Sequence, residues 1–323
     1  MNPWVLLLGG GVMLYFGAEW FVAGASSLAR TLRVPQLIIG LTVVAYGTSA
    51  PEIIVGIEAA AAGHRDVALG NVVGSNIANI GLILGLTALL RPARVDGALA
   101  RRELPVLVAS AVLVPLLLLD GVIRTWEAIG LVLVAAAYTA FMVRSARRAA
   151  LGEAQAAARS TLDAADAAGG PRPKGAWRAA ATALVGLAIL LIGGNLFIDG
   201  AVEVAKRIGM SERIVGLTLV AVGTSLPELI TSLIAARRGH SDIAIGNVIG
   251  SNTFNVFLCL GAAALAGPVG SPLATVAVEV VVLFVMTALA AWFIRSERHV
   301  TRLEGAVALA LYLVFTLVTV LRG

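Results

Sequence analysis

Long uninterrupted runs of apolar residues constrain this chain more than any other feature of its sequence. The runs are about 20 residues long and are separated by short charged stretches, and 59% of the 323 residues are hydrophobic whereas 13% are charged. A helix needs about 20 apolar residues to cross the roughly 30 Å hydrocarbon core of a bilayer. The runs also lack the alternation, over about ten residues, of a transmembrane barrel. The sequence therefore predicts an all-α integral membrane protein and excludes soluble enzymes and nucleic-acid-binding proteins.

Ten membrane-spanning helices fit these runs. The first run has neither a basic leader nor a small-residue cleavage site, so we interpret it as a span and not as a signal peptide. Loops that follow odd-numbered spans hold 18 of the 24 Lys and Arg residues. By the positive-inside rule these loops are expected to be cytoplasmic, with both termini outside. The expected spans are 3–29, 35–62, 66–90, 103–120, 125–144, 177–205, 211–236, 242–266, 272–294 and 303–321.

The sequence contains a long internal repeat. Residues 40–80 recur as residues 216–256, at a constant offset of 176 positions, and 24 of these 41 positions are identical. Most of the identical positions are polar or Gly, which argues against a duplicated scaffold without a transport role. Each copy holds five expected spans, and an odd number places the second copy upside down in the membrane, as in many secondary transporters.

The repeat divides the chain into three parts. We expect a first five-helix repeat at 1–144, a cytoplasmic linker at 145–176 and a second, inverted five-helix repeat at 177–323. The linker is rich in Ala, Arg, Gly and Pro, so we expect it to be partly helical at most and to hold no domain of its own.

A proline-containing motif lies inside one span of each copy. The motif reads GTSAPE at 47–52 and GTSLPE at 223–228. A proline within a span removes one amide donor and crowds the carbonyl four residues earlier, so each helix should break near the membrane midplane. Backbone oxygens freed at that depth are tolerated only where protein or a hydrated cavity takes them up. Together with the Thr and Ser hydroxyls they form a set of hard oxygen donors, which suits Ca²⁺, Na⁺ or Mg²⁺ and not zinc or copper.

Glu52 and Glu228 complete the two motifs near the middle of their spans. A central carboxylate costs about 2.5–3.5 kcal/mol on insertion scales, so an intramembrane acid is by default a functional candidate. No Lys or Arg lies at that depth in the four neighbouring spans. A divalent cation would balance the two charges, and the alternative is a pair of protonated, hydrogen-bonded glutamates.

The span that follows each motif carries a second polar pattern. It reads GNVVGSN followed by Asn79 in the first copy, and GNVIGSN followed by Asn255 in the second. Ser75 with Asn79, and Ser251 with Asn255, are four residues apart and so share one helix face. We expect Asn71 and Asn247 either to hold the broken helices by hydrogen bonds or to contact an ion.

Three other side chains are open to two interpretations. Glu19 aligns with Asn195 in the second copy and is either a helix-packing group or part of an ion path. Glu58 is interfacial or belongs to an outer vestibule. Cys259 is the only cysteine, and its apolar surroundings favour a packing role over a reactive one.

The paired GTSxPE and GNxxGSNxxN segments resemble the two alpha repeats of the sodium/calcium exchanger branch of the cation/Ca²⁺ exchanger superfamily. The resemblance covers both halves and is greatest to the short prokaryotic members, which lack a regulatory domain. It implies an antiporter, not an enzyme, in which Na⁺ enters down its gradient and Ca²⁺ leaves by alternating access at the midplane. No cofactor is implied, since Ca²⁺ and Na⁺ are the cargo.

The resemblance also implies a ligand set. The Ca²⁺ ligands would be Glu52 and Glu228 with the backbone oxygens of Thr48 and Thr224. The Na⁺ sites would add the Thr side chains, and Asn79 and Asn255 would complete the central cluster. The further Na⁺ ligands would be Ser49, Ser225, Ser75, Ser251 and the carbonyls of Ala45 and Ala221.

One position departs from part of the family. Several relatives, including K⁺-dependent exchangers, have an aspartate where this chain has Asn255, so the site here has Asn in both copies. This weakens the case for K⁺ co-transport.

Two other functions remain open on the sequence. In a Ca²⁺/H⁺ antiporter the same glutamates would carry protons on the return step. A passive cation channel or a sensor would show no gradient-driven flux, and the motifs favour it least because they enclose a midplane site. The expected partners are inorganic cations and the lipid bilayer, with no nucleic acid and no obligatory protein partner, in the plasma membrane of a prokaryote.

Overall fold

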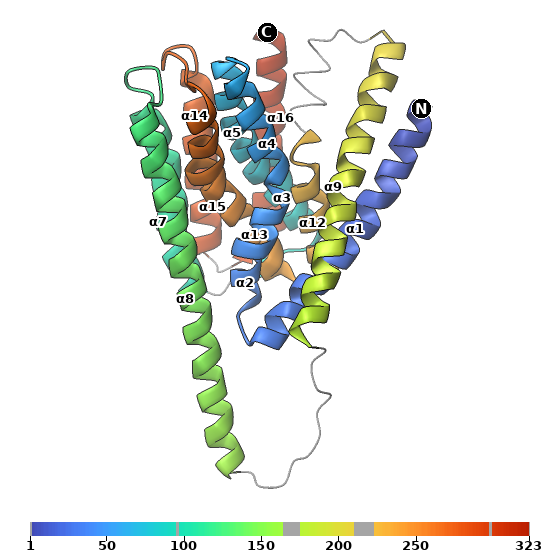
Figure 1. Ribbon diagram of the computed structural model, residues 1–323, viewed down its shortest axis with the longest axis vertical. Coiled ribbons are helices and arrows are strands. Elements are labelled where there is room, and N and C mark those ends of the chain that lie inside the picture. Colours follow the sequence, from blue (N-terminus) through green and yellow to red (C-terminus); the bar gives the residue numbers. More distant parts are fainter. Residues whose placement is uncertain (1, 95–96, 164–174, 210–222, 297–298, 323) are drawn as a thin grey trace.

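The computed structural model describes residues 2–94, 97–163, 175–209, 223–296 and 299–322, which fold almost entirely into helices (Figure 1). The helices of the first half are α1 (Pro3–Leu32), α2 (Gln36–Ile39), α3 (Ala45–Thr48), α4 (Ala50–Ala61), α5 (Arg65–Ala78), α6 (Gly85–Leu90), α7 (Gly97–Leu117) and α8 (Thr125–Asp163). Two π-helical turns, η1 (Gly40–Val44) and η2 (Asn79–Leu84), interrupt this half.

The second half has a similar order of elements. Its helices are α9 (Ala176–Arg207), α12 (Leu226–Arg237), α13 (Ser241–Phe254), α14 (Leu260–Ala266), α15 (Ala277–Ser296) and α16 (Arg302–Arg322). A π-helical turn, η4 (Asn255–Cys259), joins α13 to α14. The two short strands, β1 (Ala93–Arg94) and β2 (His299–Val300), pair antiparallel with each other.

The described helices make this an all-helical membrane protein. Seven helices are long and apolar enough to cross a membrane, and the bent pair Gln36–Thr48 and Ala50–Ala61 raises the number to eight among the described residues. Of the ten expected spans, the one at 103–120 corresponds to α7, which is not among these eight. The span at 211–236 lies partly outside the described residues.

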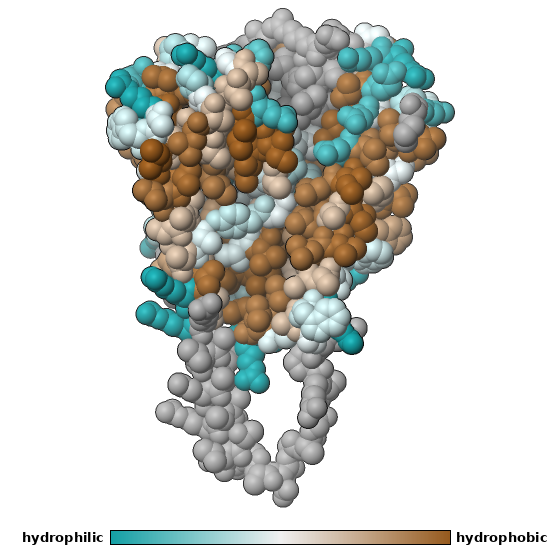
Figure 2. Space-filling model, viewed as in Figure 1, coloured by the Kyte–Doolittle hydropathy of each residue, from teal (hydrophilic) through white to brown (hydrophobic). Residues whose placement is uncertain are grey.

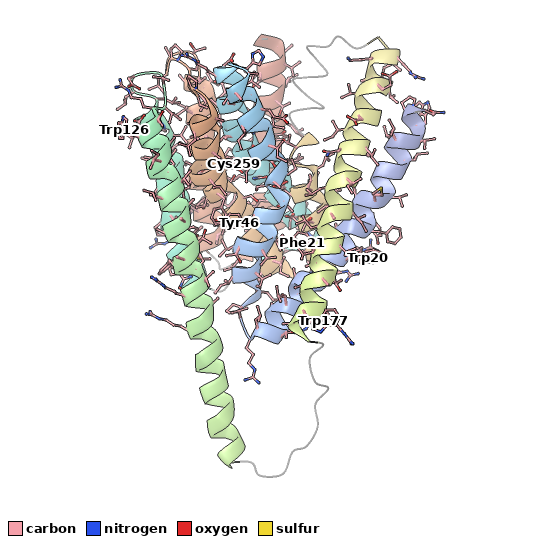
Figure 3. The ribbon with its side chains drawn as sticks, viewed as in Figure 1. Trp20, Phe21, Tyr46, Trp126, Trp177 and Cys259 are labelled. Atoms are coloured by element: carbon pink, nitrogen blue, oxygen red, sulfur yellow. The ribbon has the colours of Figure 1, made fainter. Side chains whose placement is uncertain are left out.

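The surface has the distribution of side chains that a bilayer requires. In Figure 2 hydrophobic residues cover the middle of the visible face and hydrophilic residues gather toward its two ends. Trp126 and Trp177 are 68% and 70% exposed and lie toward opposite ends of the helix bundle (Figure 3). Tryptophan is enriched at both membrane–water interfaces, and the positions of these two residues agree with that preference.

Helices α1 and α9 pack antiparallel along their whole length and lie side by side in Figure 1. A Cβ atom added at Gly17 would lie 2.5 Å from the backbone nitrogen of Leu190, so only glycine permits this approach. Six glycines form the interface at seven-residue intervals, and those of one helix are 176 positions from those of the other: Gly10, Gly17 and Gly24, and Gly186, Gly193 and Gly200.

Glycines also bring α13 against the first broken helix. A Cβ atom at Gly246 would lie 2.6 Å from the carbonyl oxygen of Leu37, and one at Gly250 would lie 2.6 Å from that of Leu41. Both contacts are with backbone, so no side-chain movement could relieve them. The close approach places Gly250 against Ala45, at the start of α3.

The first part of the expected linker, residues 145–163, is a continuation of helix α8 (Thr125–Asp163). Helix α8 runs without interruption from Thr125 to Asp163 and extends well beyond the other helices (Figure 1). Residues 145–163 are therefore helical, and residues 164–174 lie outside the described part of the chain.

Candidate ion-binding site

The first helix break occurs where the proline motif predicts it. Ser49 separates α3 from α4 with φ −80° and ψ 7°, and the two arms meet at 43°. Pro51 is the second residue of α4 and has no amide hydrogen to give to the carbonyl of Gly47. Ser225 has nearly the same backbone conformation before α12, with φ −89° and ψ 8°.

The two proline motifs exchange hydrogen bonds across the site. The Ser49 hydroxyl donates to Oε1 of Glu228 over 3.0 Å, and the Ser225 hydroxyl donates to Oε1 of Glu52 over 3.0 Å. Ser49 and Ser225 are 176 positions apart, as are the two glutamates. The two motifs therefore meet, each serine contacting the carboxylate of the other copy.

Each glutamate leaves one oxygen without a partner. Both side chains are 1% exposed, and Oε2 of Glu52 and Oε2 of Glu228 are buried with no hydrogen bond. No ion pair to either carboxylate occurs within the described part of the chain. A buried carboxylate oxygen without a donor or counter-charge is costly, so these two atoms are suited to a cation.

Two asparagines hold the backbone beside the glutamates. Asn71 Nδ2 donates to the carbonyl of Glu52 over 3.0 Å. Asn247 Nδ2 donates to the carbonyl of Glu228 over 3.4 Å and to the Ser232 hydroxyl over 3.0 Å, and its Oδ1 accepts from Thr48 over 3.1 Å. Two interpretations of these asparagines were open, a hydrogen-bonding role and contact with an ion. The structure contains the hydrogen bonds that the first interpretation predicts.

Because Asn247 makes three such bonds and Asn71 one, we expect Asn247→Leu to lower the melting temperature of the purified protein more than Asn71→Leu. Interhelical hydrogen bonds in membrane proteins contribute about 0.6 kcal/mol each on average, which gives about 2 kcal/mol against 0.6 kcal/mol. Thermal unfolding of the two variants side by side measures the difference. Equal shifts would contradict this account of the two asparagines.

The predicted serines and asparagines of the following helices are also buried. Asn79 begins η2 and Asn255 begins η4, so a π-helical turn starts at the same position of both copies. Such turns are frequent at functional sites. The Ser75 hydroxyl donates to the carbonyl of Asn71, whereas the Ser251 hydroxyl is buried without a partner.

Asn76 and Asn252 join the network, although the sequence interpretation did not single them out. Asn76 Nδ2 donates to the carbonyl of Asn252 over 3.2 Å. Asn255 Nδ2 donates to Oδ1 of Asn76 over 3.0 Å, and Asn79 Nδ2 donates to Oδ1 of Asn252 over 3.4 Å. The sequence feature that could have identified both residues is the GSN motif, which ends in Asn in each copy of the repeat.

The remaining predicted ligands occupy different positions. Thr224 is buried two residues before α12, and Ala45 is fully buried at the start of α3. Ala221 lies outside the described residues.

Two further acidic residues, Glu58 and Glu19, had two interpretations each. Glu58 is exposed on α4. Glu19 forms an ion pair with Arg238, next to the end of α12, so neither of its two interpretations included its actual partner.

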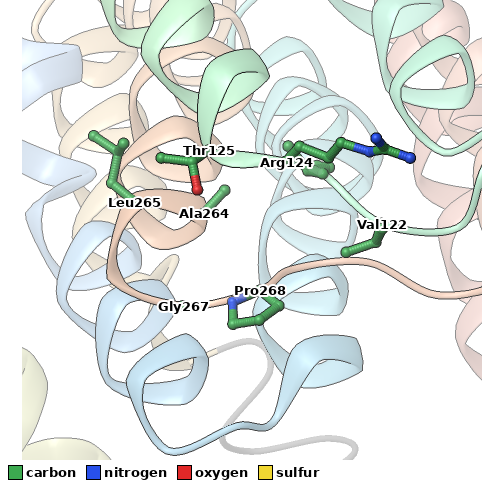
Figure 4. A pocket seen from close by; sticks show the side chains of 8 residues that line it. Val122, Arg124, Thr125, Ala264, Leu265, Gly267 and Pro268 are labelled. Atoms are coloured by element: carbon green, nitrogen blue, oxygen red, sulfur yellow. The ribbon is translucent and has the colours of Figure 1, made fainter.

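A cavity of about 330 Å³ lies elsewhere, between the α7–α8 connection and the end of α14 (Figure 4). Apart from Arg124 and Thr125, its lining is apolar or glycine. The Arg124 guanidinium is already paired with Asp120. None of the predicted ligands borders this cavity.

The sequence family described as sodium/calcium exchanger protein matches residues 2–144 and 178–321. The chain belongs to the sodium/calcium exchanger family. Membership agrees with the resemblance of the paired motifs, and it makes the protein one of a family of cation exchangers, not of enzymes.

Relatives within the sodium/calcium exchanger family cover most of the chain. It is 41% identical over 273 residues to a putative antiporter, CaxA, of Alkalimonas amylolytica, covering 82% of this chain and 81% of that protein. It is 33% identical to the sodium/calcium exchanger MaX1 of Methanosarcina acetivorans over 97% of both chains. The solved structure of the sodium-calcium exchanger NCX_Mj, soaked with Na⁺ and Ca²⁺, superposes with a TM-score of 0.81 at 31% identity, covering 97% of this chain and 96% of that one.

Proposed function

We propose that this exchanger is a secondary antiporter that moves Ca²⁺ against Na⁺ by alternating access at the Glu52/Glu228 cluster. The observation that carries the proposal is the pair of buried, unpartnered Oε2 atoms, one from each proline motif. The crossed serine bonds fix the other oxygen of each carboxylate, so both glutamates face the same small volume. Two carboxylates match the charge of one divalent cation.

The ligand set that we propose follows the resemblance. Ca²⁺ is held by Glu52 and Glu228 with the backbone oxygens of Thr48 and Thr224. Asn79 and Asn255 close the cluster. Na⁺ sites share the glutamates and Thr hydroxyls and add Ser49, Ser225, Ser75, Ser251 and the carbonyls of Ala45 and Ala221. Burial of the described members of this set supports the proposal, because a polar group at this depth needs a polar partner or an ion.

Shared ligands make the exchange obligatory. One Ca²⁺ together with a full set of Na⁺ would bring more positive charge than two carboxylates balance, so the two cargoes compete. The empty cluster would leave two charges uncompensated in an apolar passage, which penalises closing of the transporter without cargo. Competition and the penalty on the empty state together couple Ca²⁺ movement to Na⁺ movement.

We also propose the inverted plan of ten spans, with repeats at 1–144 and 177–323 and a linker at 145–176. Antiparallel packing of α1 on α9 through equivalent glycines supports it. So does the pairing of Ala93 with Val300 and of Ile123 with Val269, since Ala93 and Val269 are equivalent positions of the two copies. In this plan the linker is cytoplasmic and both termini are outside, in the plasma membrane of a prokaryote.

The test is Ca²⁺ uptake into vesicles that contain the purified protein and internal Na⁺. On dilution into sodium-free buffer containing ⁴⁵Ca²⁺, we expect uptake that requires the outward Na⁺ gradient and stops when a sodium ionophore collapses that gradient. Uptake that ignores Na⁺ and follows an imposed pH gradient would replace Na⁺ by H⁺ as the counter-ion. Flux that follows only the Ca²⁺ gradient would contradict exchange and favour a channel.

A further inference from the structure

The central asparagines Asn79 and Asn255 are equivalent in sequence but not in their hydrogen bonds. Each donates its amide to the asparagine of the opposite GSN motif, Asn79 to Asn252 and Asn255 to Asn76. Their side-chain oxygens differ. Oδ1 of Asn79 is buried without a partner, whereas Oδ1 of Asn255 lies 3.2 Å from the Sγ atom of Cys259.

The orientation of the Asn255 amide is set by its neighbours. Asn76 must direct its nitrogen at the carbonyl of Asn252, because a carbonyl only accepts hydrogen bonds. Its oxygen is thereby left to face Asn255, which must present its own nitrogen to that oxygen. The Asn255 oxygen consequently turns the other way, toward Cys259.

Cys259 is placed to donate to that oxygen. It is four residues after Asn255, at the end of η4, and is fully buried. Figure 3 shows its place among the helices. A thiol is a weak donor, but in the absence of water it satisfies an oxygen that would otherwise be orphaned. The equivalent residue of the first copy is Ile83, which is also fully buried and has no donor to offer Asn79.

We propose that Cys259 is a positioning residue that withholds the Asn255 oxygen from the transported cations, so that only Asn79 of this pair supplies a ligand oxygen. The inference rests on the proposed function and refines its ligand set: Asn255 closes the cluster with its amide, held by Asn76, and does not coordinate an ion. A site that is symmetric in sequence is thereby asymmetric in its ligands. Cation binding relieves the orphaned Asn79 oxygen, whereas binding to Asn255 would first break the thiol bond.

The first test follows the thiol itself. Cys259 is the only cysteine, so its S–H stretching band in the infrared spectrum of the purified protein is free of overlap with other thiols. We expect Asn255→Leu to shift this band, because the variant removes the acceptor. We expect saturation with Ca²⁺ or with Na⁺ to leave the band of the unmodified protein in place. A shift on ion binding like that of Asn255→Leu would overturn the proposal, since it would mean that the oxygen leaves the thiol for the ion.

The second test separates positioning from packing. Cys259→Ser and Cys259→Ala both reduce volume, but only Ser keeps a donor for Asn255. We expect Cys259→Ser to retain the apparent Na⁺ and Ca²⁺ affinities of uptake, and Cys259→Ala to change at least one of them severalfold. Asn79→Leu should weaken apparent Ca²⁺ affinity by about tenfold, and Asn255→Leu by much less. Equal effects of Ser and Ala, or of the two asparagine variants, would overturn the positioning role.

Failure of this inference differs from failure of the proposed function. If the unmodified protein exchanges Ca²⁺ for Na⁺ while Cys259→Ser and Cys259→Ala behave alike, the inference is wrong and the function stands. If the unmodified protein neither binds Ca²⁺ in calorimetry nor takes it up, both are wrong.

Discussion

Replacement of either Glu52 or Glu228 by Gln is expected to abolish Ca²⁺ uptake in sodium-loaded vesicles while the protein still inserts and purifies as a single species. Gln has nearly the same shape, and its oxygen can still accept the hydrogen bond from Ser225 or Ser49. In the proposed site, the substitution removes one of the two charges that would balance a divalent cation in a medium of low dielectric constant. We expect uptake to fall by about a hundredfold or more, equivalent to about 2.7 kcal/mol.

The same variants should respond differently to heat. Without cations the proposed site would hold two carboxylates that no counter-charge balances, so we expect each Gln variant to melt at the same temperature as the ion-free parent protein or higher. We expect Ca²⁺ to stabilise the parent, because it would bind the folded state at the proposed site, and not to stabilise the variants. This pair of results would separate loss of the ion site from loss of the fold.

Glu58→Gln is the matched control. It makes the same chemical change in the same helix, α4, but at an exposed side chain. We expect uptake and melting temperature to stay at parent values. Normal uptake by Glu52→Gln or Glu228→Gln would refute the site, whereas equal losses in all three variants would point to a general intolerance of α4 and α12 to this substitution.

Much of this fold is predictable because the features that mark a membrane helix lie within the helix's own sequence. A span must satisfy its own backbone hydrogen bonds, so apolar length marks it, and proline marks the point where it breaks. The break at Ser49 is found where 47–52 predicts it. Repetition at a fixed offset of 176 positions further identifies which residues are equivalent in the two copies.

Repetition does not say which equivalent residues touch. Ser49 bonds to Glu228 and not to Glu52, a fact that depends on how the two halves are placed and not on either motif. The same limit hid the partner of Glu19, since Arg238 lies in the other half of the chain. The sequence also does not show which differences between the copies matter. Ile83 and Cys259 are both apolar and buried, and the role proposed for the thiol depends on the position of the Asn255 oxygen, which only the structure gives.

A second large effect is expected at the α1–α9 interface. Gly17→Ala should destabilise the protein, because the new Cβ atom would lie 2.5 Å from the backbone nitrogen of Leu190 and 2.7 Å from its Cα atom. Backbone cannot move aside as a side chain can, so the two helices must separate along their whole contact. Overpacking of this kind costs about 1–3 kcal/mol, and here it acts against the propensity gain of about 1 kcal/mol that Ala has over Gly in a helix.

Gly9→Ala in the same helix provides the comparison, because nothing lies within 4 Å of its added Cβ atom. Its melting temperature should equal or slightly exceed that of the parent, whereas Gly17→Ala should melt several degrees lower. The equivalent change in the other copy, Gly193→Ala, brings a Cβ atom 2.7 Å from the backbone nitrogen of Leu14 and should lower the melting temperature by a similar amount. If Gly17→Ala were as stable as Gly9→Ala, α1 and α9 would not pack at the distance found here. In an inverted pair of repeats, equivalent glycines of the two copies should contribute equally to the α1–α9 contact. A result in which only one of Gly17→Ala and Gly193→Ala is destabilising would contradict this expectation.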